Sequence, residues 1–317
     1  MKKTKATILA FTLVVTILIV GSARTASACT RADFEKVMEA AQQTILIQQD
    51  GTIEPETAFI QRNGDTYVFT DNIYASLVVD KADVVIDGAG YTLQGPYNGT
   101  QTDLWIIGEG TNETQTDTSR VPWTVGIDVR ANTQNLTIKN LNIKNFTIAI
   151  WLWTQNNTIT ANAITENLVG ILLSGISNTV TSNLIANNRD GIFFGANQPE
   201  EIPTNITLSK NGFIDNHRHL SGCVCEDFNK TEATHTWDNG SEGNFWSDYA
   251  GYDSNQDGKG DAPYVIDALN QDRYPLTANV AVTPTVAPKT PTELIIVIAV
   301  LVAIAAVAIV GRAKKPH

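Results

Sequence analysis

Apolar and polar residues alternate in four short runs between Gly126 and Asn216, and these runs recur at a nearly constant interval. Each run opens with a small residue followed by an isoleucine: Ile127, Ile150, Ile171 and Ile192. The steps between these isoleucines are 23, 21 and 21 residues. A fixed period of this length is typical of a solenoid, in which each unit buries its apolar face only by stacking on the next. Because the runs are rich in Ile, Thr and Asn and alternate with the period of a strand, we predict an all-β fold, a parallel β-helix.

Two asparagines, five residues apart, follow each apolar run. The four pairs are Asn140 and Asn145, Asn162 and Asn167, Asn183 and Asn188, and Asn211 and Asn216. Asparagine tolerates the left-handed backbone conformation that a corner between strands requires. Neighbouring coils stack about 4.8 Å apart, so equivalent Asn side chains can hydrogen-bond from coil to coil. We expect at least one internal asparagine ladder; the alternative is that the asparagines only mark surface turns.

The same alternation predicts which side chains point outward. The four isoleucines and the residues two positions after them should point inward, so the residues between them form outward columns. One column is Asp128, Trp151, Leu172 and Phe193, and the column beside it is Arg130, Trp153, Ser174 and Gly195. An exposed aromatic and aliphatic stripe is typical of a binding face, and tryptophan rings stack on sugar rings. The candidate ligand-binding residues are therefore Trp151, Trp153, Leu172 and Phe193, unless a loop or the C-terminal segment lies across them.

Both ends of the chain carry membrane-related signals. The first residues combine lysines, an apolar core and the small-residue motif Ala26-Ser27-Ala28, which predicts a cleaved secretory signal rather than an uncleaved anchor. An apolar run from Leu294 to Val310, followed by basic residues, predicts a transmembrane helix with a cytoplasmic C-terminus rather than a core helix. The body is then expected on the cell surface, held by a single C-terminal anchor. The expected segments are a signal peptide at 1–28, an N-terminal capping helix at 29–43, the β-helix at 44–222, a C-terminal capping segment at 223–276, a Pro/Thr linker at 277–293, the transmembrane helix at 294–311 and a cytoplasmic tail at 312–317.

A formal net charge of −11 argues against a nucleic-acid partner and favours solubility at an outer surface. Eight Asn-X-Ser/Thr sequons that could carry glycans outside a membrane occur at Asn98, Asn112, Asn135, Asn145, Asn156, Asn205, Asn229 and Asn239. Asn145 is also one of the proposed ladder residues, and a side chain packed inside the coil cannot carry a glycan.

Two further motifs carry a family resemblance. The segment from Asp87 to Gly95, followed by the Asn-Thr-Ile repeats, resembles the right-handed β-helix proteins grouped with NosD, the periplasmic copper-binding accessory of nitrous oxide reductase. The ending, from Gly243 to Tyr249 and on through Pro263-Tyr264-Val265-Ile266, is similar to that of their archaeal cell-surface relatives. This resemblance, over roughly residues 44–276, implies a single-stranded right-handed parallel β-helix. It leaves the function open, because this fold hosts lyases, hydrolases, epimerases, adhesins and scaffolds.

Two segments have the spacing of metal ligands. The alternating pairs His217 and His219, and Cys223 and Cys225, suit copper(I) or zinc, although oxidation of the exported thiols, with each other or with Cys29, competes with metal binding. We do not favour copper or zinc here. A segment rich in oxygen donors has ligands at loop positions 1, 3, 5 and 9 and Gly at 6, as in a calcium loop: Asp253, Asn255, Asp257 and Asp261. Tyr264 replaces the bidentate Glu at position 12, so the prediction is a structural Ca²⁺ site, with a metal-free Asx-rich turn as the alternative.

The repeats contain no pair of carboxylates at matching positions in adjacent coils, as general acid–base or glycosidase chemistry would require. We therefore assign no catalytic residue and lean against an enzyme. The denser group Arg189, Asp190, Asp215, His217 and Arg218 is either a lyase site or, as we favour, a set of solvated turn residues. The function expected is a membrane-anchored extracellular β-helix protein that binds surface carbohydrate or serves as an envelope or adhesion component. The partner would be a surface polysaccharide or an envelope protein. The alternatives are a polysaccharide lyase or glycoside hydrolase acting on the β-helix face, and a NosD-like copper-handling accessory protein.

Overall fold

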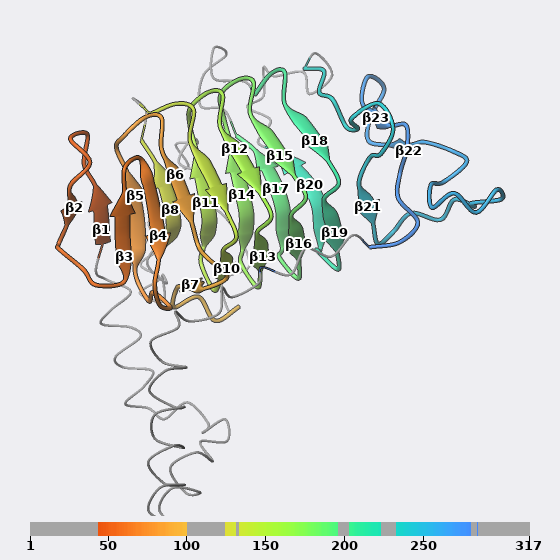
Figure 1. Ribbon diagram of the computed structural model, residues 1–317. Coiled ribbons are helices and arrows are strands. Elements are labelled where there is room, and N and C mark those ends of the chain that lie inside the picture. Colours follow the sequence, from red (N-terminus) through yellow and green to blue (C-terminus); the bar gives the residue numbers. More distant parts are fainter. Residues whose placement is uncertain are drawn as a thin grey trace, which may run out of the picture.

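The computed structural model describes residues 44–99, 124–130, 133–195, 203–222, 233–279 and 284, and every secondary structure element in them is a β-strand (Figure 1). The expected signal peptide, capping helix, transmembrane helix and cytoplasmic tail lie outside the described residues, as does most of the linker. Within the described part of the chain, no helix is long and apolar enough to cross a membrane.

The strands form three long sheets and one small one. Sheet A has the order β2 (Ile53–Glu54), β1 (Thr44–Ile47), β5 (Ser76–Val79), β8 (Val125–Val129), β11 (Ile148–Leu152), β14 (Val169–Leu173), β17 (Asp190–Phe194) and β20 (Arg218–Gly222). Sheet B has the order β18 (Thr207–Ser209), β15 (Thr179–Thr181), β12 (Thr158–Thr160), β9 (Thr137–Lys139), β6 (Val85–Asp87), β4 (Thr66–Phe69) and β3 (Ile60–Asn63). Sheet C has the order β21 (Phe245–Trp246), β19 (Gly212–Ile214), β16 (Leu184–Ala186), β13 (Ala163–Thr165), β10 (Asn142–Lys144) and β7 (Thr92–Gln94). The small sheet pairs β22 (Tyr264–Val265) with β23 (Gln271–Asp272).

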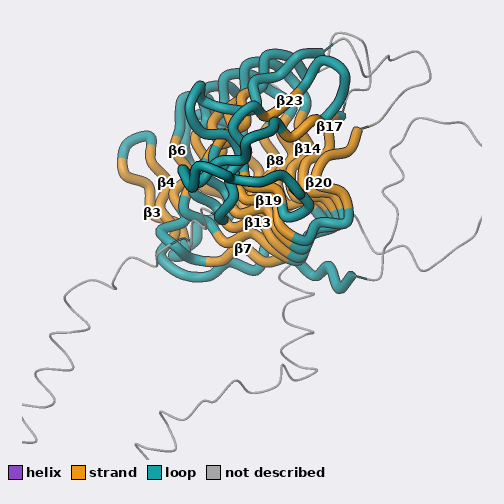
Figure 2. The backbone as a smooth tube through the Cα atoms, turned by 90° about the vertical axis from the view of Figure 1, so that its right-hand side faces the viewer, coloured by secondary structure: helices purple, strands orange, loops and turns teal. Residues whose placement is uncertain are grey.

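The predicted parallel β-helix is confirmed by this topology. Each repeat contributes one strand to each long sheet and then returns to pair in parallel with the strand one coil earlier, so that the coils lie one behind another when viewed along the axis (Figure 2). The isoleucines that define the repeat pair in register, and all four are fully buried: Ile127, Ile150, Ile171 and Ile192. The core is therefore the interior of the coil.

Asparagine ladders line this interior, as expected. One column runs through Asn162, Asn183, Asn211 and Asn244, in which each side-chain amide donates to the next Oδ1 at 3.0, 3.0 and 2.9 Å. A second column joins Asn167, Asn188 and Asn216 with Nδ2–Oδ1 distances of 3.0 and 3.0 Å. A third, which the sequence pairs did not predict, joins Asn157 to Asn178 at 3.1 Å.

The prediction was wrong for the first pair of asparagines. The ladder positions in that coil are Leu141 and Phe146, whose backbone amides donate to the asparagines one coil later, at 3.0 and 2.9 Å. Asn140 and Asn145 each lie one residue earlier, at corners with φ of 55° and 60°. The conflict between a buried ladder amide and the sequon at Asn145 therefore disappears.

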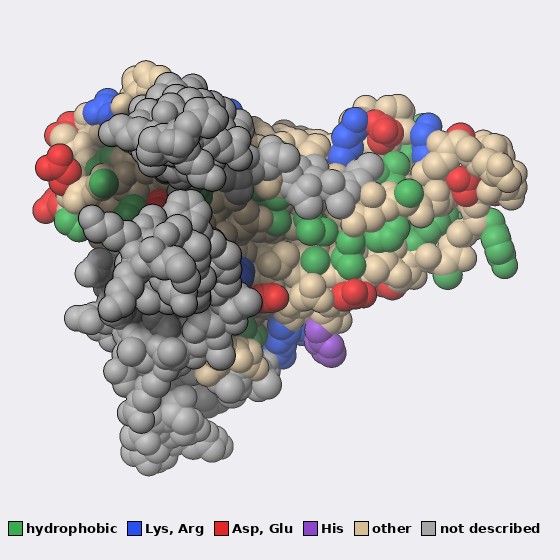
Figure 3. Space-filling view, turned by 60° about the horizontal axis from the view of Figure 1, so that its bottom comes forward, with side chains coloured by type: hydrophobic (Ala, Val, Ile, Leu, Met, Phe, Trp, Pro, Cys, Tyr) green, Lys and Arg blue, Asp and Glu red, His purple; other side chains and the backbone are tan. Residues whose placement is uncertain are grey.

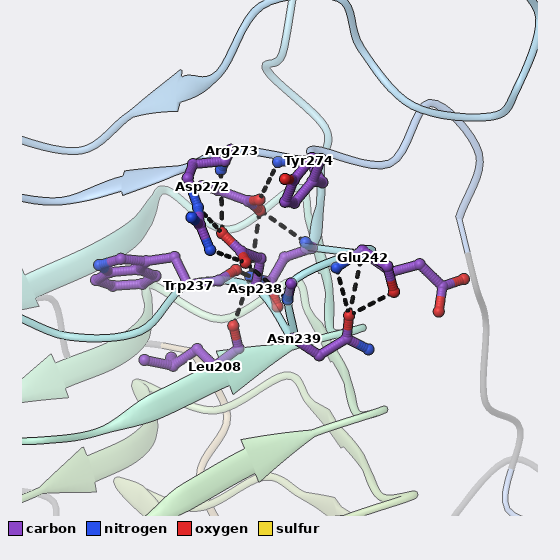
Figure 4. A network of polar contacts seen from close by, with 11 residues as sticks. Leu208, Trp237, Asp238, Asn239, Glu242, Asp272, Arg273 and Tyr274 are labelled. Atoms are coloured by element: carbon purple, nitrogen blue, oxygen red, sulfur yellow. Dashed lines mark hydrogen bonds and ion pairs between the residues drawn. The ribbon is translucent and has the colours of Figure 1, made fainter.

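The C-terminal segment closes the open end of the solenoid. Strand β21 pairs with β19 and so continues sheet C, and the Trp246 ring stacks between the rings of Phe213 and Tyr264 at centroid distances of 4.4 and 4.3 Å. Asn244 donates its side-chain amide to the carbonyls of Leu208 and Trp237, and its backbone amide donates to the carboxylate of Asp272. Figure 4 shows Leu208, Trp237 and Asp272 within one network of polar contacts. The last coil thus has partners for backbone groups that would otherwise form an exposed sheet edge.

Candidate functional site: the outer face of sheet A

The outward column predicted from the sequence exists and lies on the outer face of sheet A. Asp128 pairs with Trp151, Trp151 with Leu172, Leu172 with Phe193, and Phe193 with Ser221. These side chains lie opposite the main core, and an apolar cluster separate from that core includes Ile148, Val169, Leu172 and Phe193 with Val125 and Trp151 against it.

The four candidate ligand-binding residues differ in exposure. Leu172 and Phe193 are only 5% and 7% exposed, so the expectation that they form an open stripe is corrected. Trp151 and Trp153 are half-buried, and their rings lie 5.0 Å apart at an interplanar angle of 36°. The accessible part of this face is therefore the tryptophan pair, while the aliphatic part packs within the protein.

An ion pair stands one coil away from the tryptophan pair. Arg130 Nε lies 3.1 Å from Asp128 Oδ2, and Asp128 pairs in register with Trp151. Burial raises the pKa of the Asp128 carboxyl, and the positive charge of Arg130 partly opposes this shift. The sequence placed both residues in the outward columns but gave no reason to assign them to the site. Only the strand register shows that this ion pair lies beside the indole rings.

Two polar atoms in the column are buried without a hydrogen-bond partner in the part of the chain that the structure describes. They are Trp151 Nε1 and the Ser221 hydroxyl, which lie on either side of the apolar residues Leu172 and Phe193. Buried donors are satisfied in the great majority of cases, so each exception calls for an explanation. The buried Trp151 indole N–H thus lies near the Asp128–Arg130 ion pair without an acceptor among the described residues.

The charged group considered as a lyase site does not assemble as one. Asp190, which is 2% exposed, is bound by Arg218 through two nitrogens, with Nη2–Oδ2 at 2.8 Å. The backbone amide of Asp215 instead binds Ser247 Oγ at 3.1 Å, and His217 is exposed. Arg218 therefore holds this carboxylate in a bidentate ion pair.

A family model described as "Periplasmic copper-binding protein (NosD)" matches residues 44–251, more than half of the chain. The chain belongs to the NosD family. The match spans the stacked coils of the β-helix and confirms the resemblance seen in the repeats. A comparison with curated proteins returned no match. The family description is that of a periplasmic protein, which agrees with a body outside the cytoplasmic membrane.

The described residues of this NosD-family chain do not fit a copper centre. Copper(I) needs soft or imidazole donors that converge on one point. Among the residues the structure describes, no three His, Cys, Asp or Glu side chains do so. His219 Nδ1 lies 3.3 Å from Asn216 Nδ2, and its Nε2 lies 3.3 Å from Asp248 Oδ1. Burial lowers the pKa of His219, and Asp248 and Asp215 act in the opposite direction. The other proposed thiol ligands, Cys223 and Cys225, lie outside the described residues.

The predicted calcium loop is an exposed turn held by its own side chains. The backbone amide of Asp257 donates to Asp253 Oδ1 at 3.1 Å and to Asn255 Oδ1 at 3.0 Å. Asp253 Oδ2 accepts from the Gly258 amide at 2.9 Å, and Asp261 Oδ2 accepts from Ser254 at 3.1 Å. The four oxygen-bearing side chains lie in one turn, but among the described residues Asp253, Asp257 and Asp261 do not form a group of three carboxylates that could hold a metal ion. Calcium binding there stays a prediction.

Proposed function

We propose that this NosD-family protein is a cell-surface β-helix that binds surface carbohydrate on the outer face of sheet A. The observation that carries the proposal is the half-buried pair Trp151 and Trp153 beside the Asp128–Arg130 ion pair. Aromatic rings pack against the apolar face of a sugar ring, and nearby charged groups hydrogen-bond its hydroxyls.

In this proposal the residues have different roles. Trp153 and Trp151 are tilted by 36°, so they offer a bent platform rather than a single flat ring. Asp128 would accept, and Arg130 would donate, hydrogen bonds at the edge of a sugar lying on this platform. The Trp151 indole N–H has no partner among the described residues, but it is buried, so a sugar would reach it only if the ring turned outward. Because parallel coils repeat about every 4.8 Å, a sugar ring would span roughly one coil step.

The two ends of the sequence support a membrane tether for this body. Residues 1–28 have the pattern of an export signal and residues 294–311 that of a transmembrane helix, so the protein would be held outside the cell by its C-terminus. The calcium loop would rigidify the C-terminal cap by binding Ca²⁺ through Asp253, Asn255, Asp257 and Asp261.

Glycans on the protein itself belong to the same proposal. Asn135, Asn156 and Asn205 are exposed sequon residues at corners with positive φ. The corner positions lead directly into sheet B, where the sequon threonines line up in register: Thr137, Thr158 and Thr207, with Thr179 between the last two. Peptide mass spectrometry of the native protein tests their occupancy.

A glycan-array screen of residues 29–292 tests the carbohydrate proposal. The wild-type protein is compared with the Trp153→Ala variant and with Tyr252→Ala, which removes an aromatic side chain that is 82% exposed elsewhere. Binding that is lost in the first variant and kept in the second supports the site. Binding to no glycan, or equal binding by all three proteins, contradicts it. Analysis of every bound glycan for cleavage products tests the alternative of a polysaccharide lyase or hydrolase.

Copper handling is the second candidate, and the description of the family favours it. The ligands would be His217, His219, Cys223 and Cys225, and His219 would have to leave Asn216 and Asp248. Metal content of the purified protein, measured with the thiols kept reduced, decides this alternative: stoichiometric copper supports it, and copper that is unchanged by the double substitution of both cysteines with serine opposes it.

A further inference from the structure

The outer face of sheet C changes character along the solenoid. In its first coils the outward positions are polar, with Thr92 and Gln94 on β7 and Asn142 and Lys144 on β10. In the later coils Thr165 is still polar, but the other outward positions are apolar or lack a side chain: Ala163, Leu184, Ala186, Gly212, Ile214 and Phe245. Hydrophobic side chains gather on this side of the molecule toward its C-terminal half (Figure 3). If the whole outer face of sheet C were exposed to solvent, its outward residues would be expected to stay polar in every coil.

Part of this apolar face is covered. Ala163 is 8% exposed and Ala186 is 4% exposed, although the strand alternation turns both away from the core, which receives Ile164 and Ile185. Leu184 and Ile214 are half-buried rather than exposed. This part of the face is therefore largely shielded from solvent.

Residues 276–279 of the same chain lie against this face. Leu276 pairs with Phe245 one step beyond the last coil, and only three residues later Asn279 lies over Gly212, two coils back. A Cβ on Gly212 would lie 2.6 Å from Asn279 Oδ1 and 3.7 Å from Leu184 Cδ1. Between Leu276 and Asn279 the chain thus runs back along the outside of sheet C, in the direction of the first coils. Pro284, five residues farther on, is half-buried.

We propose that residues 280–283 of the linker dock along the apolar outer face of sheet C and carry the chain back toward the first coils. The occupant matches the face in length and polarity. From Gly212 to Ala163 is two coil steps, about 10 Å, which three extended residues cover. Those three residues are Val280-Ala281-Val282, which are apolar like Leu184 and Ala163.

The consequence is a defined orientation of the body, which rests on the proposed membrane tether. The linker residues that follow, 283–293, are rich in proline and threonine and span about 30 Å when extended. Only about 10 Å separate β13 from β7. The anchor therefore leaves the body on the side of the first coils, and β21, β22 and β23 with the calcium loop point away from the membrane.

Cysteine pairs in the full-length membrane protein test the docking. The native cysteines at 29, 223 and 225 are replaced by serine, and Val282→Cys is combined with Ala163→Cys. The control combines Val282→Cys with Thr158→Cys, which lies in the same coil but on the outer face of sheet B. Thiols held at disulfide distance should give at least about tenfold more intramolecular disulfide in the first pair than in the control, as quantified by mass spectrometry of the linked peptides. Both variants must show the melting temperature of the cysteine-free protein when reduced.

Equal linkage in the two pairs overturns the proposal, and so does linkage of Ala163→Cys between two chains, which would assign the face to a second copy. Extraction of the same membranes at alkaline pH tests the tether separately. If the disulfide forms but the protein is released from the membrane, the docking is supported and the tether is refuted. If the disulfide does not form and the protein stays in the membrane, only the docking is refuted.

Discussion

The backbone amide of Asn244 donates to Oδ2 of Asp272 at 2.6 Å, so a carboxylate ends the column of four asparagines. The same carboxylate accepts from the Trp246 indole at 3.0 Å and from the Tyr274 amide at 3.1 Å. Asp272 is fully buried, and burial raises the pKa of its carboxyl while the hydrogen bonds from Asn244, Trp246 and Tyr274 oppose this rise. Asp272, in the C-terminal segment, thus supplies the hydrogen-bond acceptor for the last asparagine of the ladder.

Replacement of Asp272 by alanine should strongly destabilise the protein. The donors of Asn244 and Trp246, which are buried, and the half-buried amide of Tyr274 would lose their acceptor. Each such loss costs about 1–3 kcal/mol, so we expect the free energy of unfolding to fall by about 3 kcal/mol or more. Urea unfolding followed by circular dichroism measures this change. Asp71→Ala, which removes an exposed carboxylate, should change it by less than about 0.5 kcal/mol. Similar losses in the two variants would show that the carboxylate is not the end point of the ladder.

The ladder itself is tested by two asparagines that the sequence pattern treated alike. Asn183→Leu removes the Oδ1 that accepts from both the backbone and the side chain of Asn162, so we expect a loss of about 2–4 kcal/mol. Asn145→Gly changes a corner residue with φ of 60°, a conformation that glycine adopts without strain. The free energy of unfolding of this variant should stay within about 0.5 kcal/mol of that of the wild type. Midpoints of urea unfolding compare the two. A large loss in Asn145→Gly would restore the original ladder assignment.

Removal of one ring from the tryptophan pair should weaken glycan binding. Trp153→Ala is expected to lower affinity about tenfold, since one aromatic contact contributes about 1–1.5 kcal/mol. Arg130→Gln keeps the length of the side chain and tests the polar edge of the same site. Isothermal titration with a glycan identified on the array measures both changes. If Trp153→Ala binds as tightly as the wild type, the sheet A face is not the site.

Calcium should stabilise the C-terminal cap through Asp257. In calcium, Asp257→Ala should melt roughly 5 °C below the wild type, because a ligand bound only to the folded state raises stability. In chelator the two proteins should melt together. A loss of equal size with and without calcium would mean that Asp257 acts only through its hydrogen bonds to the Asn255 side chain and the Lys259 amide.

His235 should make the protein less stable in acid. Its ring stacks on Phe194 at a centroid distance of 5.1 Å, and burial lowers the pKa of the imidazole to about 4, with Asp267 opposing the shift. Because the folded state resists protonation, stability is fully present above the unfolded pKa of 6.5 and is lost as the pH falls toward 4. His235→Phe keeps the stack and should reduce the loss between pH 7 and pH 4.5 by on the order of 2 kcal/mol. Unfolding curves at both pH values measure the effect, and an unchanged loss would place the acid sensitivity elsewhere.

Much of the candidate site was visible in the sequence, and the rest was not. The columns that contain Asp128, Trp151 and Trp153 follow from strand alternation and the repeat length, because these are local properties of the chain. Alternation says nothing of what lies over a sheet, so the sequence left open whether this column is covered, and only the structure shows that Leu172 and Phe193 are buried. Asp128 and Arg130 were not assigned to the site for a related reason. Their position beside the tryptophans of the next coil depends on the strand register.

The sequence by itself determined the stacking of the coils and the inward direction of Ile127, Ile150, Ile171 and Ile192. A period of about 21 residues with strand alternation leaves few other ways to bury these side chains. Only the tertiary structure decided which asparagines join the ladder, how Asp272 ends it and which outer faces are covered. These features depend on hydrogen bonds between residues about 21 to 33 positions apart, where a shift of one residue at a corner moves a side chain from the interior to the surface.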